Sequence, residues 1–187
     1  MGGSTENLIK NILRDIEIEL RDEFDRNFER EAFFSEGWQR RQSPVRGDGH
    51  LLVDTGSLRR SLGSEQSGSS VVFRSEHPAA SIHNEGGEIR VTERMKRYFW
   101  HKYYESLGSF GRRKDGTLRK DKRNSHLSEV ADFYRAMALK KTGSTVKIPK
   151  RQFLGASPEV EKTVREIIEE NIEEYIRGEF PDKTIMI

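Results

Sequence analysis

Apolar residues recur every four positions near the start of the chain and define its clearest element. This spacing keeps side chains on one face of an α-helix. It predicts an amphipathic helix from Thr5 to Arg30, roughly 40 Å long at about 1.5 Å per residue. Because that length exceeds what a small core covers, part of the apolar face should pack either on a neighbouring subunit or along the chain's own sheet. The stripe consists of Leu8, Ile12, Ile16, Leu20, Phe24 and Phe28.

Short strands are predicted in the middle of the chain. Val71–Arg74 is β-branched and apolar and follows a polar turn over 64–70. Two further short strands, 78–83 and 88–91, flank Gly86-Gly87, and two glycines between strands are typical of a β-hairpin. The pattern therefore predicts a small antiparallel β-sheet.

The second half of the chain alternates between helical and irregular patterns. An aromatic and basic helix is expected over 95–110 and a second helix over 128–141. Between them, 108–125 is glycine-rich and basic with almost no apolar residue, which predicts a flexible loop. A short strand over 146–149 precedes an acidic helix over 157–180, capped by Ser157. The predicted fold class is α+β: a long N-terminal helix and further helices packed on a small antiparallel β-sheet, with a basic flexible loop, in one domain spanning 1–187.

Composition narrows the classes of function. The chain has 187 residues, 34% of them charged and none of them cysteine. The absence of cysteine excludes disulfides, zinc–thiolate sites, iron–sulfur clusters and cysteine nucleophiles. The N-terminus lacks the pattern of a signal peptide, and no apolar stretch approaches the ~20 residues that span a bilayer. We expect a protein that is made in a cytoplasm-like environment, stays soluble there and makes no membrane contact.

A net charge of only +2 hides a strong asymmetry along the chain. From Arg90 to Asn124 there are twelve Lys or Arg against four Asp or Glu. From Glu159 to Phe180 there are eight Glu against three Lys or Arg. Charge segregated in this way is typical of assembly or steering surfaces.

The stretch IHNEGG, residues 82–87, is the strongest candidate for catalysis. His83 and Glu85 would share one face of a strand and could begin a metal site or act as a general acid and base. A catalytic zinc needs three protein ligands, and no other histidine has suitable spacing. The alternative is that the histidine and asparagine hydrogen-bond a turn whose glycines supply positive φ. The residues favour this alternative, with no metal, no cofactor and no small-molecule substrate.

Two other motifs have chemical interpretations. The triplet Asp54-Thr55-Gly56 resembles an aspartic-protease motif, but it precedes a helix start and has no second copy. The basic run could bind nucleic-acid phosphates, although nothing in it indicates base readout; it contains Arg112, Arg113, Lys114, Arg119, Lys120, Lys122 and Arg123.

Four motifs, read in order, resemble the phage virion morphogenesis family, the tail-completion proteins of Mu-like phages and prophages. They are LLVDTGSLRRS (51–61), AASIHNEGG (79–87), TERMK (92–96) and IPKRQFLG (148–155). The resemblance spans roughly Phe24 to Glu170.

The resemblance implies a non-enzymatic structural protein with no catalytic residues. It would act in tail completion and head–tail joining, as an oligomeric ring at the neck or head-proximal end of the tail of the virion, after synthesis in the bacterial host cytoplasm. Expected partners are further copies of the chain and other phage neck or tail proteins. The basic loop would either face passing DNA in the lumen or form an interface. Assembly contacts are predicted at Arg59, Arg60, Arg151 and Phe153. The alternative is a nucleic-acid-binding module that uses the Arg90–Arg123 region.

Overall fold

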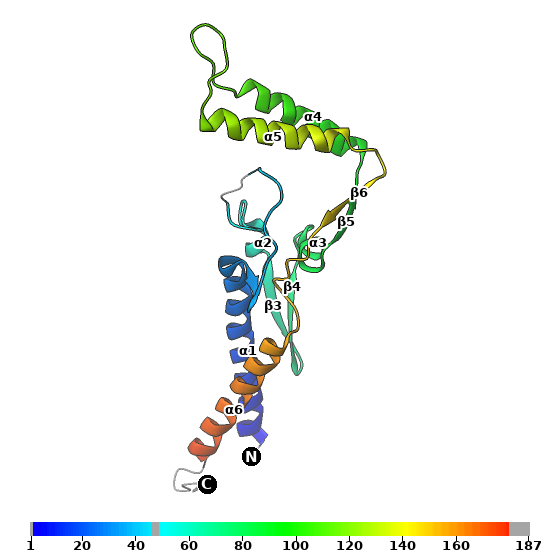
Figure 1. Cartoon of the computed structure of the whole chain (residues 1–187). Helices are drawn as coiled ribbons and strands as arrows, with labels where there is room; N and C mark the ends of the chain where they lie inside the picture. The colour runs from blue at the N-terminus through cyan, green and yellow to red at the C-terminus, as the bar shows by residue number, and fades with distance from the viewer. Residues whose placement is uncertain (1, 46–48, 180–187) are drawn as a thin grey trace.

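The molecule is elongated, with a helical pair at each end and a small mixed body between them (Figure 1). This computed structural model describes residues 2–45 and 49–179. At one end, helices α1 (Gly2–Arg30) and α6 (Pro158–Glu179) lie side by side. At the other end, helices α4 (Glu93–Gly108) and α5 (Lys122–Leu139) form an antiparallel hairpin. We call the first pair the stalk and residues 93–139 the arm.

Helix α1 forms where the four-residue spacing predicts it, three residues longer at its start. Its apolar face packs against α6 and against the hairpin of β3 (Leu62–Ser67) and β4 (Ser70–Ser75). The cluster that holds them together contains Ile16, Leu20, Phe24, Phe33 and Ile167. The long stripe is thus covered mainly by the chain's own elements, although Ile9 and Ile18 remain about half exposed.

A second apolar cluster fills the body. It joins the C-terminal end of α1 to segments far away in the sequence, because Phe28 and Phe153 are both wholly buried with ring centroids 5.1 Å apart. The indole Nε1 of Trp38 donates to the Gln152 carbonyl over 2.6 Å. The short strands β1 (Ala32–Phe33) and β2 (Glu36–Gly37) turn the chain from α1 into this cluster. Its buried members are Phe28, Trp38, Leu51, Leu58, Ala80 and Phe153.

The α+β class is confirmed, but the predicted β-pairing is wrong in two places. Residues 64–70 belong to the β3–β4 hairpin, which turns at Gly68, and are not a lone polar turn. Residues Ala80–Glu85 form helix α3 and not a strand, so no hairpin surrounds Gly86-Gly87. Instead β5 (Gly87–Arg90) pairs with β6 (Thr145–Ile148). The strands make three separate two-stranded sheets.

The β5–β6 ribbon carries the arm away from the body (Figure 1). Among the described helices and strands, α4 and α5 make extensive contact only with each other. Helix α5 starts at Lys122, six residues earlier than expected, because the Asp121 side chain accepts a hydrogen bond from the Asn124 amide over 2.9 Å. An N-cap of this kind satisfies an amide that the first helical turn leaves without a partner.

The loop of the arm covers 109–121, a shorter range than the predicted 108–125. Arg112 and Leu118 form an antiparallel bridge within it. The buried Asn124 side chain closes its base by donating to the carbonyls of Gly111, over 2.9 Å, and Arg119, over 2.7 Å. Hydrogen bonds therefore hold the base of this loop together. At the other end of the chain, α6 agrees with the predicted helix to within one residue, and Phe180 lies outside the described residues.

Candidate functional site

Three of the four sequence motifs meet at one place, beside the buried cluster of the body. The carboxamide oxygen of Asn84 accepts hydrogen bonds from the backbone amides of Phe153, over 2.9 Å, and Leu154, over 3.0 Å. The Arg151 amide donates to the His83 carbonyl over 2.7 Å. The motif at 79–87 therefore holds the motif at 148–155 in place by accepting hydrogen bonds from its backbone amides.

Gly86 lies at the closest approach between these two motifs. Its φ of 74° and ψ of −176° belong to a region that side-chain-bearing residues rarely adopt. A Cβ atom there would lie 2.8 Å from the Lys150 backbone nitrogen. A glycine at this position lets the chain pass from α3 into β5 while the 148–155 segment runs alongside.

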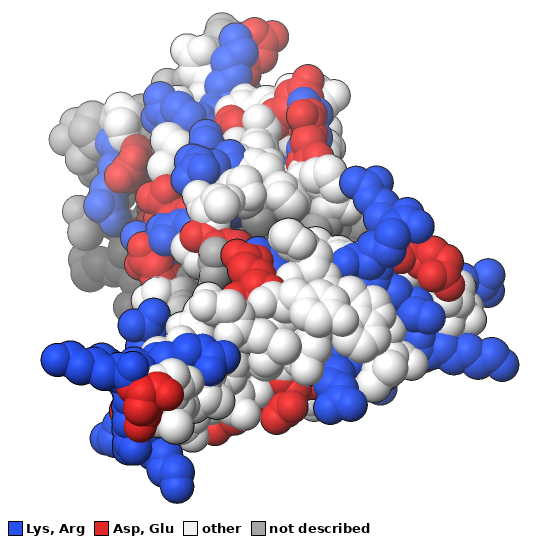
Figure 2. Space-filling view, turned by 90° about the horizontal axis from the view of Figure 1, so that it is seen from above, with Lys and Arg blue, Asp and Glu red and all other residues white. Residues whose placement is uncertain are grey.

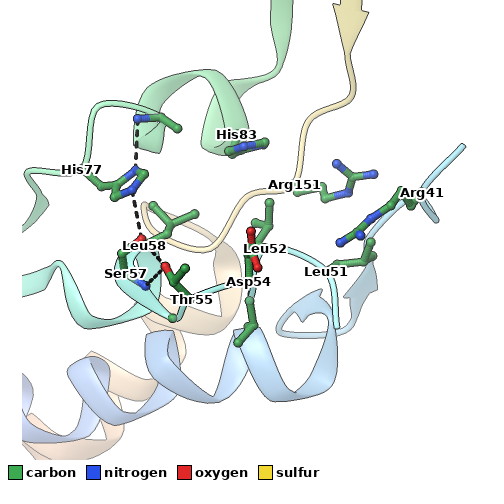
Figure 3. A pocket seen from close by; sticks show the side chains of 13 residues that line it. Arg41, Leu51, Leu52, Asp54, Thr55, Ser57, Leu58, His77, His83 and Arg151 are labelled. Carbon is green, nitrogen blue, oxygen red and sulfur yellow. Dashed lines mark hydrogen bonds between the residues drawn. The ribbon is translucent and has the colours of Figure 1, made fainter. Parts of the chain in front are cut away.

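A pocket of about 390 Å³ opens between the 51–58 motif, α3 and the 148–155 segment (Figure 3). Its apolar part comes mainly from Leu51, Leu52, Val53 and Leu58. On one side, hydroxyl and imidazole groups form a chain, because Thr55 Oγ1 donates to Ser57 Oγ over 2.9 Å and Ser57 Oγ lies 3.3 Å from His77 Nε2. The Ala79 amide donates to His77 Nδ1 over 3.1 Å, so Nε2 carries the proton of the neutral ring. The polar members are Arg41, Asp54, Thr55, Ser57, His77, His83 and Arg151.

Arg151 is the buried charge of this pocket. Only 8% of the residue is exposed, and its Nε donates to the Gln39 carbonyl over 3.0 Å. Burial lowers the pKa of the guanidinium, the positive charge of Arg41 lowers it further, and Glu31 acts in the opposite direction. No carboxylate of the described residues forms an ion pair with it. Sequence reasoning assigned Arg151 to assembly, whereas the structure places it inside the pocket.

His83 faces the same pocket with an imidazole that lacks a full set of partners. Its Nδ1 is buried and has no hydrogen-bond partner among the described residues. Burial lowers the pKa of the ring, and the charges of Arg151 and His77 contribute in the same direction. Glu85 lies at the exposed end of α3, where it accepts from Ser81 Oγ over 3.4 Å. Within residues 2–45 and 49–179, no group of three or more His, Asp or Glu side chains is placed to hold a metal ion.

The other predicted assembly residues have different environments. Phe153, which was predicted to contact another molecule, is wholly buried in the core, where its apolar ring is more stable than on the surface. The Arg59 guanidinium pairs with Asp25 and, over 2.7 Å, with Glu29, and thereby ties α2 (Ser57–Arg60) to α1. The exposed Arg60 donates to the Thr55 carbonyl over 2.9 Å.

The basic residues of the loop all lie on the surface of the arm. Seen from the arm side, Lys and Arg side chains gather at the left and right of the view, with uncharged and some acidic side chains between them (Figure 2). Large apolar side chains are exposed here too, with Tyr98 at 54%, Tyr104 at 63% and Leu139 at 63%. The exposed basic residues are Arg112, Arg113, Lys114, Arg119, Lys120, Lys122 and Arg123.

The opposite charge collects in a groove of the stalk, which sequence reasoning missed. This groove of about 530 Å³ runs between α1 and α6 and has no Lys or Arg in its lining. The acidic face of α6 could be recognised in the sequence, but only the packing of the two helices adds the carboxylates of α1. The acidic lining residues are Asp15, Glu19, Glu23, Glu166 and Glu170.

Comparison with known proteins gives one match. The model of the phage virion morphogenesis family matches residues 5–173. No curated protein and no solved structure matches significantly. None of the helices described in the structure has both the length and the apolar character needed to cross a membrane.

Proposed function

The chain belongs to the phage virion morphogenesis family, and from this premise we propose that it is a non-enzymatic structural protein of tail completion and head–tail joining. In this proposal it works as an oligomeric ring at the neck or the head-proximal end of the tail. The family match, which covers 5–173, carries the proposal.

The charge distribution supports assembly from identical copies. The arm has twelve Lys or Arg against six Asp or Glu, while the two stalk helices together have sixteen Asp or Glu against eight Lys or Arg. Arm and stalk lie at opposite ends of the molecule (Figure 1), so an arm cannot reach the groove of its own chain. Attraction between them therefore acts between copies.

The arm is also built to have a partner. Its two helices pack mainly on each other, and Tyr98, Tyr104 and Leu139 are exposed. Aromatic side chains are common in the buried centres of interfaces. Placing the arm of one copy against the acidic groove of the next would cover these side chains and bring unlike charges together.

Such a contact joins two different faces, and a heterologous contact closes into a ring when its rotation closes. Repeated around an axis, it would leave each subunit with one arm bound and one groove filled. Tail-completion proteins are expected to work through such shape and interface complementarity, with no chemical step.

Light scattering across a concentration and salt series tests the assembly. We expect the mass to rise with protein concentration and to fall with salt, because salt screens exposed charges. Lowering the negative charge of the groove with Glu166→Lys and Glu170→Lys should give monomers. The matched control, Glu161→Lys with Glu174→Lys, makes the same charge change on exposed positions of α6 that do not line the groove. If the control pair lowers the oligomer mass as much as the groove pair does, the proposal that the groove is the assembly contact is wrong.

A mixture of two variants tests the contact between arm and groove directly. Lys114→Glu with Lys120→Glu lowers the net charge of the arm from +6 to +2 and leaves the groove intact, while the groove variant keeps its arm intact. Each should be monomeric alone, and together they should form dimers that cannot grow further.

In the phage, deletion of the gene should leave heads and tails unjoined in electron micrographs; normal virions would contradict tail completion.

A nucleic-acid-binding module is the second candidate, because the five basic residues of the arm loop and the two that begin α5 are all exposed. Backbone contacts to DNA weaken steeply with salt. A mobility shift with generic duplex DNA that disappears as salt rises, and that Lys114→Glu with Lys120→Glu abolishes, would support it. If the chain does not bind duplex DNA at low salt, this second candidate is excluded.

A further inference from the structure

The pocket beside α3 is lined by a largely buried charge, Arg151, and by an imidazole with one unpartnered nitrogen, His83. Arg151 keeps a charged guanidinium at 8% exposure with one backbone carbonyl as its hydrogen-bond acceptor. His83 Nδ1 is buried without a partner among the described residues. Buried polar groups normally have partners, and a buried charge without one is costly. Both groups line the pocket of about 390 Å³ (Figure 3).

The geometry points to this pocket as a binding site for a single carboxylate carried on an apolar group, such as the end or an acidic side chain of an apolar peptide segment. A carboxylate would accept hydrogen bonds from the Arg151 guanidinium and neutralise its charge. It would also offer an acceptor to His83, whose protonated form is otherwise disfavoured by burial and by Arg151.

The lining explains why a carboxylate fits better than a phosphate. The planar guanidinium matches the two oxygens of a carboxylate. The leucine side chains on the opposite wall offer burial to an apolar carrier, which a free inorganic anion lacks; they are Leu51, Leu52 and Leu58.

The site does not depend on the assembly proposed above. It lies in the body, between α3, the 51–58 motif and the 148–155 segment, and uses residues of neither the acidic groove nor the basic loop. The three motifs that build it are among the four that carry the resemblance of this chain to its family. Because the three motifs meet at this pocket, the proposal gives them a shared role in ligand binding in addition to packing.

Nuclear magnetic resonance of the full chain tests the site with N-acetyl-leucine, which carries one carboxylate on an apolar body. N-acetyl-leucinamide is the matched probe without charge, and inorganic phosphate is the anion without a carrier. We expect N-acetyl-leucine to shift the Arg151 Nε–H and His83 ring signals and to raise the pKa of His83. The amide should bind at least about tenfold more weakly, since it loses a charge-assisted hydrogen bond.

Arg151→Gln should abolish the shifts, and Arg40→Gln is the control because it removes the same charge from an exposed neighbour outside the pocket. Three outcomes would overturn the site: the acid and the amide bind equally well, the shifts persist in Arg151→Gln, or the His83 signals do not shift. Binding of phosphate as tightly as the acid would overturn the choice of a carboxylate. If Arg151→Gln fails to fold, the comparison of the three probes on the wild-type chain decides.

Discussion

One side-chain oxygen of Asn84 accepts the backbone amides of both Phe153 and Leu154, at 2.9 and 3.0 Å. These residues are about 70 positions apart in the chain, and this pair of bonds holds the 148–155 segment against α3. The wholly buried Phe153 ring depends on that placement, since it enters the core directly after the bonded amide.

Asn84→Ala should therefore destabilise the protein. It leaves two partly buried amides without an acceptor, which we expect to cost about 2 kcal/mol of unfolding free energy. Urea denaturation measures the change. Glu85→Ala, at the exposed neighbouring position, should change the unfolding free energy by less than roughly 0.5 kcal/mol. Equal effects of the two variants would contradict the role of Asn84.

Gly86→Ala should be among the most damaging small substitutions in the chain. The new Cβ would lie 2.8 Å from the Lys150 nitrogen in a backbone conformation that alanine rarely adopts, at a cost of roughly 3 kcal/mol. Thermal unfolding gives the measurement. Gly37→Ala is the control because nothing lies within 4 Å of its added Cβ. A melting temperature of Gly86→Ala close to that of the control would contradict the close approach.

Arg59 should act within the chain through Asp25. Because both side chains are partly exposed, at 29% and 42%, a double-mutant cycle should give a coupling of about 1 kcal/mol or less. Arg60→Ala, whose partner is an exposed backbone carbonyl, should have a smaller effect on stability than Arg59→Ala. If Arg59 is also an assembly contact, its alanine variant should lower the oligomer mass under conditions in which the monomer remains folded.

His83 should make stability depend on pH. Its pKa in the folded chain is lowered from the ordinary 6.5 by burial, so the unfolded chain binds the proton more readily. The stabilising effect of the neutral ring is then fully present above about pH 6.5 and is lost as pH falls through the lower folded pKa.

Urea denaturation between pH 7.5 and 5 checks this, with His83→Gln for comparison. Wild type should lose more stability on acidification than the variant, and Arg151→Gln should raise the pKa of His83 by removing a nearby positive charge. Identical pH profiles of wild type and His83→Gln would contradict the assignment.

The helices that carry their own signals could be predicted well. The spacing of apolar residues in α1 and the Ser157 cap of α6, whose Oγ accepts from the Val160 amide over 3.2 Å, are local features. The charge runs on the arm and on α6 could likewise be recognised without a structure. The helix signals and the charge runs depend only on residues that are close together in the sequence.

The strand prediction at residues 80–85 was wrong because the structure there depends on segments far away in the sequence. Small and apolar residues there fit a strand or a short helix equally well, and the two glycines that follow suggest a hairpin turn. The partner of β5 is β6, more than fifty residues later, and no local pattern announces that pairing. The burial of Phe153 could not be predicted for a related reason, since the Lys150-Arg151-Gln152 sequence before it gives no local sign of complete burial.

The sequence by itself determined the long amphipathic helices, the α+β class, the opposite charges of arm and α6, and the motifs that place the chain in its family. These follow from local periodicity, capping and composition. Only the tertiary structure decided that three motifs meet at one pocket, that Arg151 is buried within it, and that α1 adds its carboxylates to those of α6. Such juxtapositions depend on contacts between residues far apart in the chain, and hydrophobic burial favours them without specifying the pairing in any local pattern.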